Sequence, residues 1–119
     1  MIQIFGHDKC KGTRAAQRFF AERGVKVQAI DVRQKPPSKG ELQSIARAVG
    51  GVSALIDLGG QRARDRGLQH AGASEARLME LLSEDGGLLV TPVVRNGAAA
   101  TLGEAQATWK AWVAAIKAG

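Results

Sequence analysis

The stretch that decides the fold is residues 2–20, which read IQIFGHDKCKGTRAAQRFF. An apolar strand is predicted over residues 2–5, and Gly6 ends it. A short polar turn follows, and it contains the only cysteine of the chain, Cys10. Apolar residues then recur on one face at i, i+4 spacing, which predicts a helix over residues 11–23. A thiol at the start of a helix meets free N–H groups and the positive end of the helix dipole, so this pattern predicts a stabilised thiolate.

The segments after this stretch continue as a strand and then as helices. Gly24 ends the first helix, and apolar residues alternate with polar ones over residues 25–30, which predicts a second strand. A strand–helix–strand unit implies parallel pairing through a right-handed connection. Ser38 and Glu41 then form a capping box at the start of a helix. Residues 59–72 are polar and rich in glycine, so we expect a loop with one helical turn at most.

The last third of the chain predicts a hairpin and a final helix. Ser74 caps a helix that ends at Gly86-Gly87, and an apolar segment then leads into Thr91-Pro92. Asn96-Gly97 lies between two apolar runs, which is a strong hairpin signal. A helix is predicted over residues 104–117, and its tryptophans are expected to pack in the core.

This element order is that of an α/β, thioredoxin-like fold. It reads β-α-β, a helical insertion over about residues 38–87, and then β-β-α. The two halves together predict a mixed four-stranded sheet. With 119 residues and no linker, the chain is predicted to form a single domain over residues 1–119. In this arrangement Cys10 lies at the first strand-to-helix turn, and Thr91-Pro92 lies at the entry to the third strand.

Composition narrows the classes of function. The chain has 17 basic and 11 acidic residues, a formal charge of +6, but its basic residues are scattered. Aromatic residues for stacking on bases are nearly absent from the polar segments, so no direct nucleic-acid partner is expected. There is no apolar run of membrane-spanning length and no signal peptide, so we expect no membrane partner and a cytoplasmic monomer. One cysteine excludes an internal disulfide, and with only His7 and His70 as further soft ligands no metal site is expected.

The turn carries groups that favour the thiolate of Cys10. Lys9 and Lys11 flank it, and Arg14 follows one helical turn later. Thr13 lies three residues after the sulfur, where both its hydroxyl and its backbone N–H can point at a thiolate. Settings of this kind lower a cysteine pKa from about 8.5 to roughly 3.5–7.5. We therefore predict a reactive thiol rather than a small buried side chain.

Other cysteine and glycine motifs do not fit this turn. A P-loop would need Gly-Lys-Ser/Thr, and the chain has Lys11-Gly12-Thr13. A phosphatase-type loop would end in an arginine at position 16, where Ala16 stands, and a two-cysteine motif would need a cysteine at position 13. The thiol therefore needs a second thiol from outside, and glutathione is the obvious one. His7 could act as a base or a local cation, or be merely solvated, and His70 is assigned no role.

Four segments resemble the arsenate reductase-like group of thioredoxin folds, which includes the ArsC and Spx proteins. They are, in chain order, GHDKCKGTRAAQRFFAERGV, KPPSKGELQSIARAVG, GVSALID and TPVVRNG. The resemblance covers nearly the whole chain. It implies a catalytic cysteine at Cys10 and a proline at Pro92, usually cis, that presents backbone to the thiol.

The chain departs from the resemblance at the oxyanion site. Arsenate reductases of this kind use three arginines, and the corresponding positions here hold Asp57, Thr91 and Glu104. Two acids and a neutral residue would not hold arsenate. Substitutes elsewhere in the chain remain open at this point: Arg62, Arg64 or Arg95.

Two classes of function therefore stand against each other. The first is a glutathione-coupled thiol–disulfide oxidoreductase with no bound cofactor, in which Cys10 reacts and glutathione, or another thiol substrate, binds beside Thr91 and Pro92. The second is a regulatory binding module like the Spx proteins, which contact RNA polymerase, although Thr13 removes the paired cysteine through which those usually sense oxidation. A third hypothesis is that the fold has been retained without activity and that the Cys10 thiol is inert.

Overall fold

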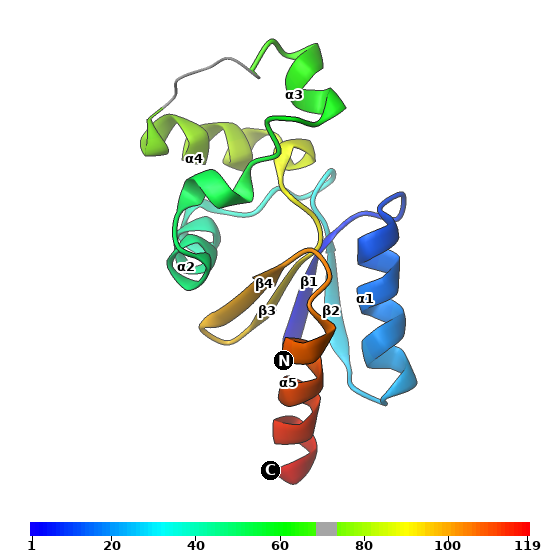
Figure 1. The fold of residues 1–119 in the computed structure, drawn as a ribbon. Coiled ribbons are helices and arrows are strands. Elements are labelled where there is room, and N and C mark those ends of the chain that lie inside the picture. The colour runs from blue at the N-terminus through cyan, green and yellow to red at the C-terminus, as the bar shows by residue number, and fades with distance from the viewer. Residues whose placement is uncertain (69–73) are drawn as a thin grey trace.

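The computed structural model describes residues 1–68 and 74–119, so His70 lies outside the described residues. The elements follow in chain order: β1 (Ile2–Gly6), α1 (Lys11–Glu22), β2 (Val27–Asp31), α2 (Lys39–Val49), η1 (Val52–Leu55), α3 (Gln61–Asp65), α4 (Glu75–Glu84), η2 (Gly86–Leu88), β3 (Val93–Asn96), β4 (Ala99–Leu102) and α5 (Gln106–Ala118). Figure 1 shows α1 and α5 beside the sheet, and the helices of the insertion at the sheet's other side and its upper end.

The sheet has four strands in the order β2-β1-β3-β4. Strand β1 pairs in parallel with β2 and antiparallel with β3, and β3 pairs antiparallel with β4. The predicted mixed four-stranded sheet and α/β fold class are therefore confirmed. The insertion separates β2 from β3 in the sequence and leaves the two halves to meet along β1 and β3.

One face of the sheet packs against the first and last helices. Alternate strand residues supply the sheet side of this core, Ile2 and Ile4 from β1 and Val94 from β3. Phe19 and Phe20 of α1 meet Trp109 of α5, with ring centroids 5.5 and 5.8 Å from that of the indole. The buried indole also donates a hydrogen bond from Nε1 to Thr101 Oγ1 at 2.9 Å, as expected of a buried tryptophan.

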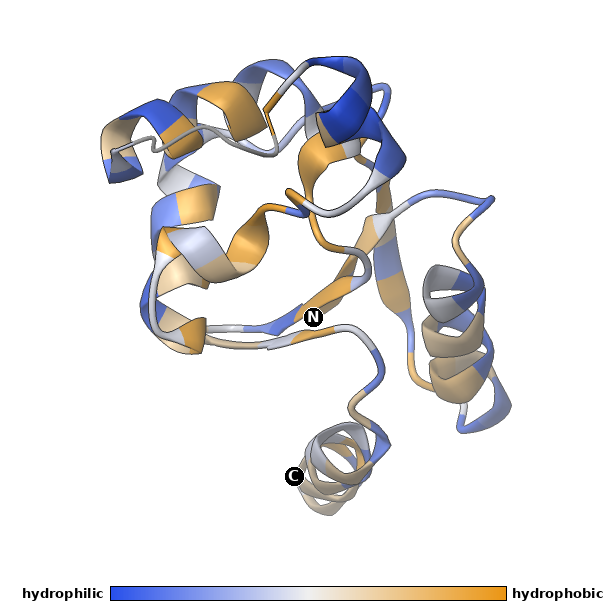
Figure 2. Cartoon of the chain, turned by 45° about the horizontal axis from the view of Figure 1, so that its top comes forward, coloured by the Kyte–Doolittle hydropathy of each residue, from blue (hydrophilic) through white to orange (hydrophobic). Residues whose placement is uncertain are grey.

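The opposite face of the sheet packs against the insertion. Phe5 and Val93 point to this side because strand side chains alternate between faces. They meet leucines and isoleucines from α2, η1, α4 and η2, and Leu42, Ile45 and Leu82 are fully buried. Figure 2 shows the insertion helices alternating between hydrophilic and hydrophobic residues, the pattern of helices that bury one side. No helix of the described residues is both long and apolar enough to cross a membrane.

The predicted caps form, and several boundaries move. Ser38 and Glu41 make both hydrogen bonds of a capping box, and the Ser74 hydroxyl accepts from the N–H of Arg77. Strand β2 begins two residues later than predicted, since the N–H of Val25 instead bonds Phe20 O at the end of α1. Helix α5 also starts two residues late, because Ala105 has a non-helical backbone, φ −144° and ψ 56°.

Two further segments differ from the prediction in detail. The polar stretch after Gly59 contains one short helix, α3, whose Ala63 is fully buried. The hairpin forms, with Asn96 paired to Ala99, so its two-residue loop is Gly97-Ala98. Gly97 has φ +60°, which fits a type II′ turn with glycine first.

Candidate active site

The sheet topology brings the ends of two strands together around the thiol. Strand β3 runs antiparallel to β1, with Phe5 opposite Val93. The residues that follow β1 therefore lie beside those that precede β3. Thr91 Oγ1 lies 3.2 Å from Cys10 Sγ and donates to it, and the thiol lies 3.7 Å from the Thr91 carbonyl oxygen. Residues 81 apart in the sequence thus form one site.

Cys10 is the N-cap residue of α1. Its backbone is extended, and its carbonyl accepts the first helical hydrogen bond, from the N–H of Arg14. At this position a side chain meets the free N–H groups of the first turn, here those of Gly12 and Thr13. No regular capping hydrogen bond forms with the neutral thiol, so these N–H groups act chiefly on the thiolate. The helix thus presents its positive end to the half-buried sulfur.

Two glycines let the turn close around Cys10. A Cβ on Gly12 would lie 2.8 Å from Pro92 Cδ and 3.8 Å from Cys10 Sγ. A Cβ on Gly6 would overlap the buried side chain of Thr13. Helix α1 therefore sits directly against both the end of β1 and the Thr91-Pro92 peptide bond, which is cis.

The surroundings lower the pKa of Cys10 below its ordinary value. Burial is the largest single influence and raises this pKa, but several hydrogen bonds together outweigh it. In order of size, the pKa of the thiol is lowered by the Thr13 side chain, the Thr91 side chain, and the backbone N–H groups of Thr13 and Gly12. The Thr13 hydroxyl has no regular hydrogen-bond partner among the described residues, so it is free to turn toward a thiolate.

The cations named from the sequence lie around the turn rather than on the sulfur. Lys9, Lys11 and Arg14 are all exposed. Arg14 Nη1 donates to the backbone carbonyl of Asp8 at 2.6 Å, which ties its guanidinium to the turn. The main causes that lower the Cys10 pKa are hydrogen bonds and include none of these three charges. Water screens exposed charges, so short-range donors dominate here.

His7 lies in the same turn, and its carbonyl accepts the N–H of Cys10 at 3.1 Å. Burial and the nearby charge of Arg33 lower its pKa, against the opposing influence of Asp31 and Asp8. These influences disfavour the charged imidazolium form, which argues against a role as a local cation. Its buried Nδ1 has no hydrogen-bond partner among the described residues.

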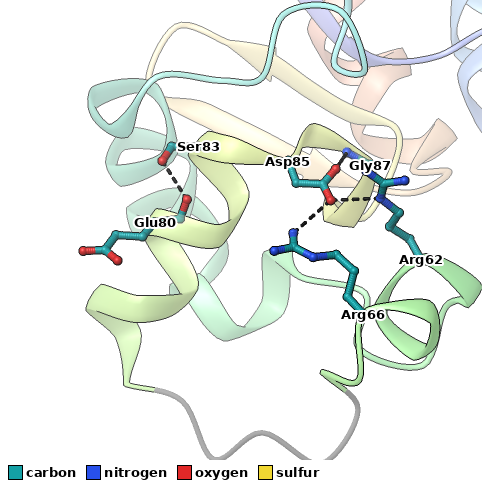
Figure 3. Close-up of polar contacts among 6 residues, drawn as sticks. All are labelled: Arg62, Arg66, Glu80, Ser83, Asp85 and Gly87. Carbon is teal, nitrogen blue, oxygen red and sulfur yellow. Dashed lines mark hydrogen bonds and ion pairs between the residues drawn. The ribbon is translucent and has the colours of Figure 1, made fainter.

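The three arginines that could have replaced the missing oxyanion ligands are bonded to other groups and not to the thiol site. Arg64 donates to the carbonyl of Gly59, and Arg95 donates to Gln3 Oε1 at 2.8 Å. Arg62 joins Arg66 on the carboxylate of Asp85, at 2.9 and 3.0 Å (Figure 3). None of these bonds involves Thr91 or Cys10.

Asp85 organises this basic cluster, and the sequence analysis assigned it no role. Its side chain is only 11% exposed and also accepts the N–H of Gly87 at 3.1 Å. Burial raises the pKa of Asp85, but the bonds from Arg62, Gly87 and Arg66 outweigh it and lower that pKa overall. The signal in the sequence was Asp before Gly-Gly, a frequent N-terminal cap, but its arginine partners lie in another segment.

Asp57 and Glu104, the acids at two of the three oxyanion positions, are both exposed. The N–H of Asp57 donates to the carbonyl of Leu88, and its carboxylate folds back on Gly60. Within residues 1–68 and 74–119, no three side chains of His, Cys, Asp or Glu gather closely enough to hold a metal ion.

Comparison with known proteins agrees with this fold. The family model described as the ArsC family matches residues 5–112. The chain belongs to the ArsC family. Its relatives include the uncharacterized protein YusI of Bacillus subtilis, 28% identical over 105 residues, which are 86% of this chain and 89% of YusI. The arsenate reductase of Neisseria meningitidis serogroup A is 28% identical over 102 residues, covering 83% of this chain and 87% of that protein.

A solved structure shows the same fold. The solution structure of SACOL0876 from Staphylococcus aureus superposes with a TM-score of 0.79 at 29% identity, covering 95% of this chain and 99% of that one. The match spans both halves of the sheet and the insertion between them. Cys10 and Thr91-Pro92 therefore lie within an ArsC-family fold, as the resemblance implied.

Proposed function

We propose that this ArsC-family protein is a single-cysteine thiol–disulfide oxidoreductase that uses glutathione and does not reduce arsenate. The observation that carries the proposal is the hydroxyl of Thr91, which donates to Cys10 Sγ at 3.2 Å at the N-terminus of α1. A thiolate held by neutral donors is a nucleophile toward disulfides. We place the reaction in the cytoplasm, where the glutathione pool is reduced.

The reaction runs in two exchanges. The Cys10 thiolate attacks the glutathionyl sulfur of a mixed disulfide, which forms a Cys10–glutathione disulfide and expels the substrate thiolate, which takes a proton from water. A glutathione thiolate then attacks the glutathionyl sulfur of that adduct, which forms glutathione disulfide and returns the Cys10 thiolate. Because the chain has no second cysteine, the second thiol must come from solution.

Among the described residues, no arginine forms a hydrogen bond with Cys10 or Thr91, and this supports the exclusion of arsenate. Position 91, directly before the cis-proline, holds a threonine whose hydroxyl is already bonded to the sulfur. Arg64 and Arg95 are bonded away from the site. An oxyanion next to Cys10 would therefore lack the bidentate guanidinium contacts that stabilise it. The name arsenate reductase belongs to relatives that are 28% identical.

The test is turnover of a glutathionylated peptide with glutathione, measured as release of glutathione disulfide. We expect activity from the native chain and none above background from Cys10→Ser, whose hydroxyl is not a nucleophile at neutral pH. Arsenate with glutathione should yield no arsenite. Ser53→Ala, a change at an exposed position, serves as the control and should keep full activity.

Two results would overturn the proposal. One is equal turnover by Cys10→Ser and the native chain, which would leave Cys10 no role. The other is a thiol with an ordinary pKa together with recovery of RNA polymerase subunits by the purified chain, which would favour the Spx-like binding module.

A further inference from the structure

A basic cavity lies next to the turn that holds Cys10. It encloses about 360 Å³, and the residues that line it are His7, Arg33, Arg62, Asp85 and Gly87. A second hollow of about 340 Å³ shares Arg33, Arg62 and Asp85 with the first and adds Arg66 and Glu84. These residues come from four segments: the β1–α1 turn, the end of β2, α3, and the junction of α4 with η2. Four separate segments thus converge on one small space.

The position of the cavity follows from the topology of the sheet. Strands β1 and β2 are parallel, so the residues after both strands emerge at the same edge. His7 follows β1 there, and Arg33 follows β2. Figure 1 shows α3 above this edge, and Arg62 of α3 lines the cavity together with His7. Since His7 O accepts the N–H of Cys10, the cavity wall and the thiol belong to the same turn.

The guanidinium groups of the cavity have N–H donors that form no hydrogen bond with the described residues. Arg62 contacts Asp85 through Nε, so no hydrogen bond among the described residues occupies its terminal nitrogens in that pair. The Arg33 guanidinium makes no ion pair or hydrogen bond with any described residue. Asp85 is already satisfied by Arg62, Arg66 and the N–H of Gly87 (Figure 3).

The charges that remain favour an anion. In the first cavity two guanidinium groups face one saturated carboxylate, beside His7, whose buried Nδ1 has no hydrogen-bond partner among the described residues. In the second hollow three guanidinium groups face Asp85 and Glu84. A carboxylate that approached Arg33 and Arg62 would meet two planar forks, the geometry that binds a carboxylate bidentately.

We propose that this cavity binds a carboxylate of the peptide-like thiol that reacts at Cys10, with Arg33 and Arg62 as its ligands. The inference rests on the proposed glutathione-coupled function, because it gives a binding site to a carboxylate of the glutathionyl group, at a distance from the reacting sulfur. Sulfur would then be held at the Cys10–Thr91 end and the acid at the arginine end.

The experiment uses a probe that binds without reacting. S-methylglutathione keeps both carboxylates but has no thiol or disulfide, and its diester masks both carboxylates. We expect calorimetric titration of the full chain to show binding of S-methylglutathione that is at least about tenfold weaker in Arg33→Gln, the size expected for a charge-assisted hydrogen bond. Arg18→Gln, a change at an exposed arginine of α1, is the matched control and should bind as the native chain does.

Further arms separate this site from the chemistry at Cys10. Cys10→Ser should lose turnover yet keep the Arg33-dependent binding. If the native chain has no turnover but binding still depends on Arg33, the proposed function fails and the carboxylate site stands. The carboxylate site is wrong if turnover is normal while two affinities are unchanged. These are the affinity of Arg33→Gln for S-methylglutathione, compared with the native chain, and the affinity of the native chain for the diester, compared with S-methylglutathione. Tighter binding of inorganic phosphate than of S-methylglutathione would also overturn it, because the cavity would then be an inorganic anion site.

Discussion

At the scale of single residues, Thr91 is the side chain that most distinguishes this site. It stands where the family resemblance led us to expect arginine, and its hydroxyl donates to Cys10 Sγ. A hydroxyl stabilises a thiolate without adding charge, whereas a guanidinium would also attract an oxyanion. The same position therefore decides both the reactivity of the sulfur and the charge of what can approach it.

Removal of this hydroxyl should raise the pKa of Cys10. In Thr91→Val the thiolate loses a donor that lowers its pKa, so the midpoint of the alkylation rate against pH should move upward. Thr91→Ser keeps the hydroxyl and should stay near the native midpoint. Iodoacetamide alkylation followed by mass spectrometry measures all three. An unchanged midpoint in Thr91→Val would assign the lowered pKa to the helix N-terminus and Thr13 alone.

Gly12 tests the contact between α1 and Pro92. Gly12→Ala would put a methyl group 2.8 Å from Pro92 Cδ, so Pro92 or the helix must shift, and we expect a loss of about 1–3 kcal/mol in unfolding free energy. Gly40 is the second residue of α2, as Gly12 is of α1, and a Cβ there meets only Ser38 Oγ at 4.0 Å. Gly40→Ala should therefore be neutral or stabilising by up to about 1 kcal/mol. Urea unfolding compares the two, and equal effects would contradict the close approach.

At the scale of elements, Asp85 joins α3 to the end of α4. It receives hydrogen bonds from Arg62 and Arg66 and caps η2 through Gly87. Helix α3 has only five residues and is too short to be stable by itself, so its place depends on such tertiary contacts and on the buried Ala63. Asp85 thus fixes α3, which forms one wall of the basic cavity.

Asp85→Asn should destabilise the fold by about 1 kcal/mol at pH 7, through the loss of charge-assisted bonds. The folded pKa of Asp85 is lowered, so its stabilisation is present above its unfolded pKa of about 3.9 and is lost as pH falls through the folded pKa. The gap between native and variant in urea unfolding should therefore shrink below about pH 4. Glu80→Gln breaks the exposed Arg77–Glu80 pair and should change little. A gap that widened in acid would contradict this reading.

At the scale of the whole molecule, two hydrophobic cores on opposite faces of one sheet stabilise the fold. The aromatic core joins α1 to α5, which are far apart in the sequence, and the second core joins the insertion to the sheet. Both cores depend on the central pair β1–β3, the strands that also bring Cys10 to Thr91. The fold and the site therefore stand on the same pairing.

Trp109 should be the more costly of the two tryptophans to remove. Trp109→Ala deletes a fully buried indole that contacts both Phe19 and Phe20, and should cost about 3–5 kcal/mol. Trp112 is only half-buried, so Trp112→Ala should cost clearly less. Urea unfolding followed by circular dichroism compares them without relying on indole fluorescence. Similar losses from both would mean that α5 is held along its whole apolar face and not through Trp109.

Local patterns predicted most of this architecture. The capping serines and the hairpin glycine each act within a few residues, so Ser38, Ser74 and Gly97 could be assigned from their neighbours alone. The Cys10 turn was likewise visible, since strand, cysteine and helix are contiguous. What could not be predicted were contacts between distant segments: the link from Asp85 to Arg62, and the place of Arg33 at the shared edge of β1 and β2. Such contacts depend on tertiary packing, which has no local signature.

The long separation between Cys10 and Thr91 has a consequence for the protein as it is made. The turn emerges from the ribosome while the strand that completes its site, 81 residues later, is still untranslated. Until then β1 lacks its antiparallel neighbour β3, and pairings this distant in sequence form late. The nascent turn thus has only the local donors of Thr13 and Gly12, and the donor from Thr91 is added after residue 91 has been synthesised. The full set of donors around Cys10 therefore forms only after β3 has paired with β1.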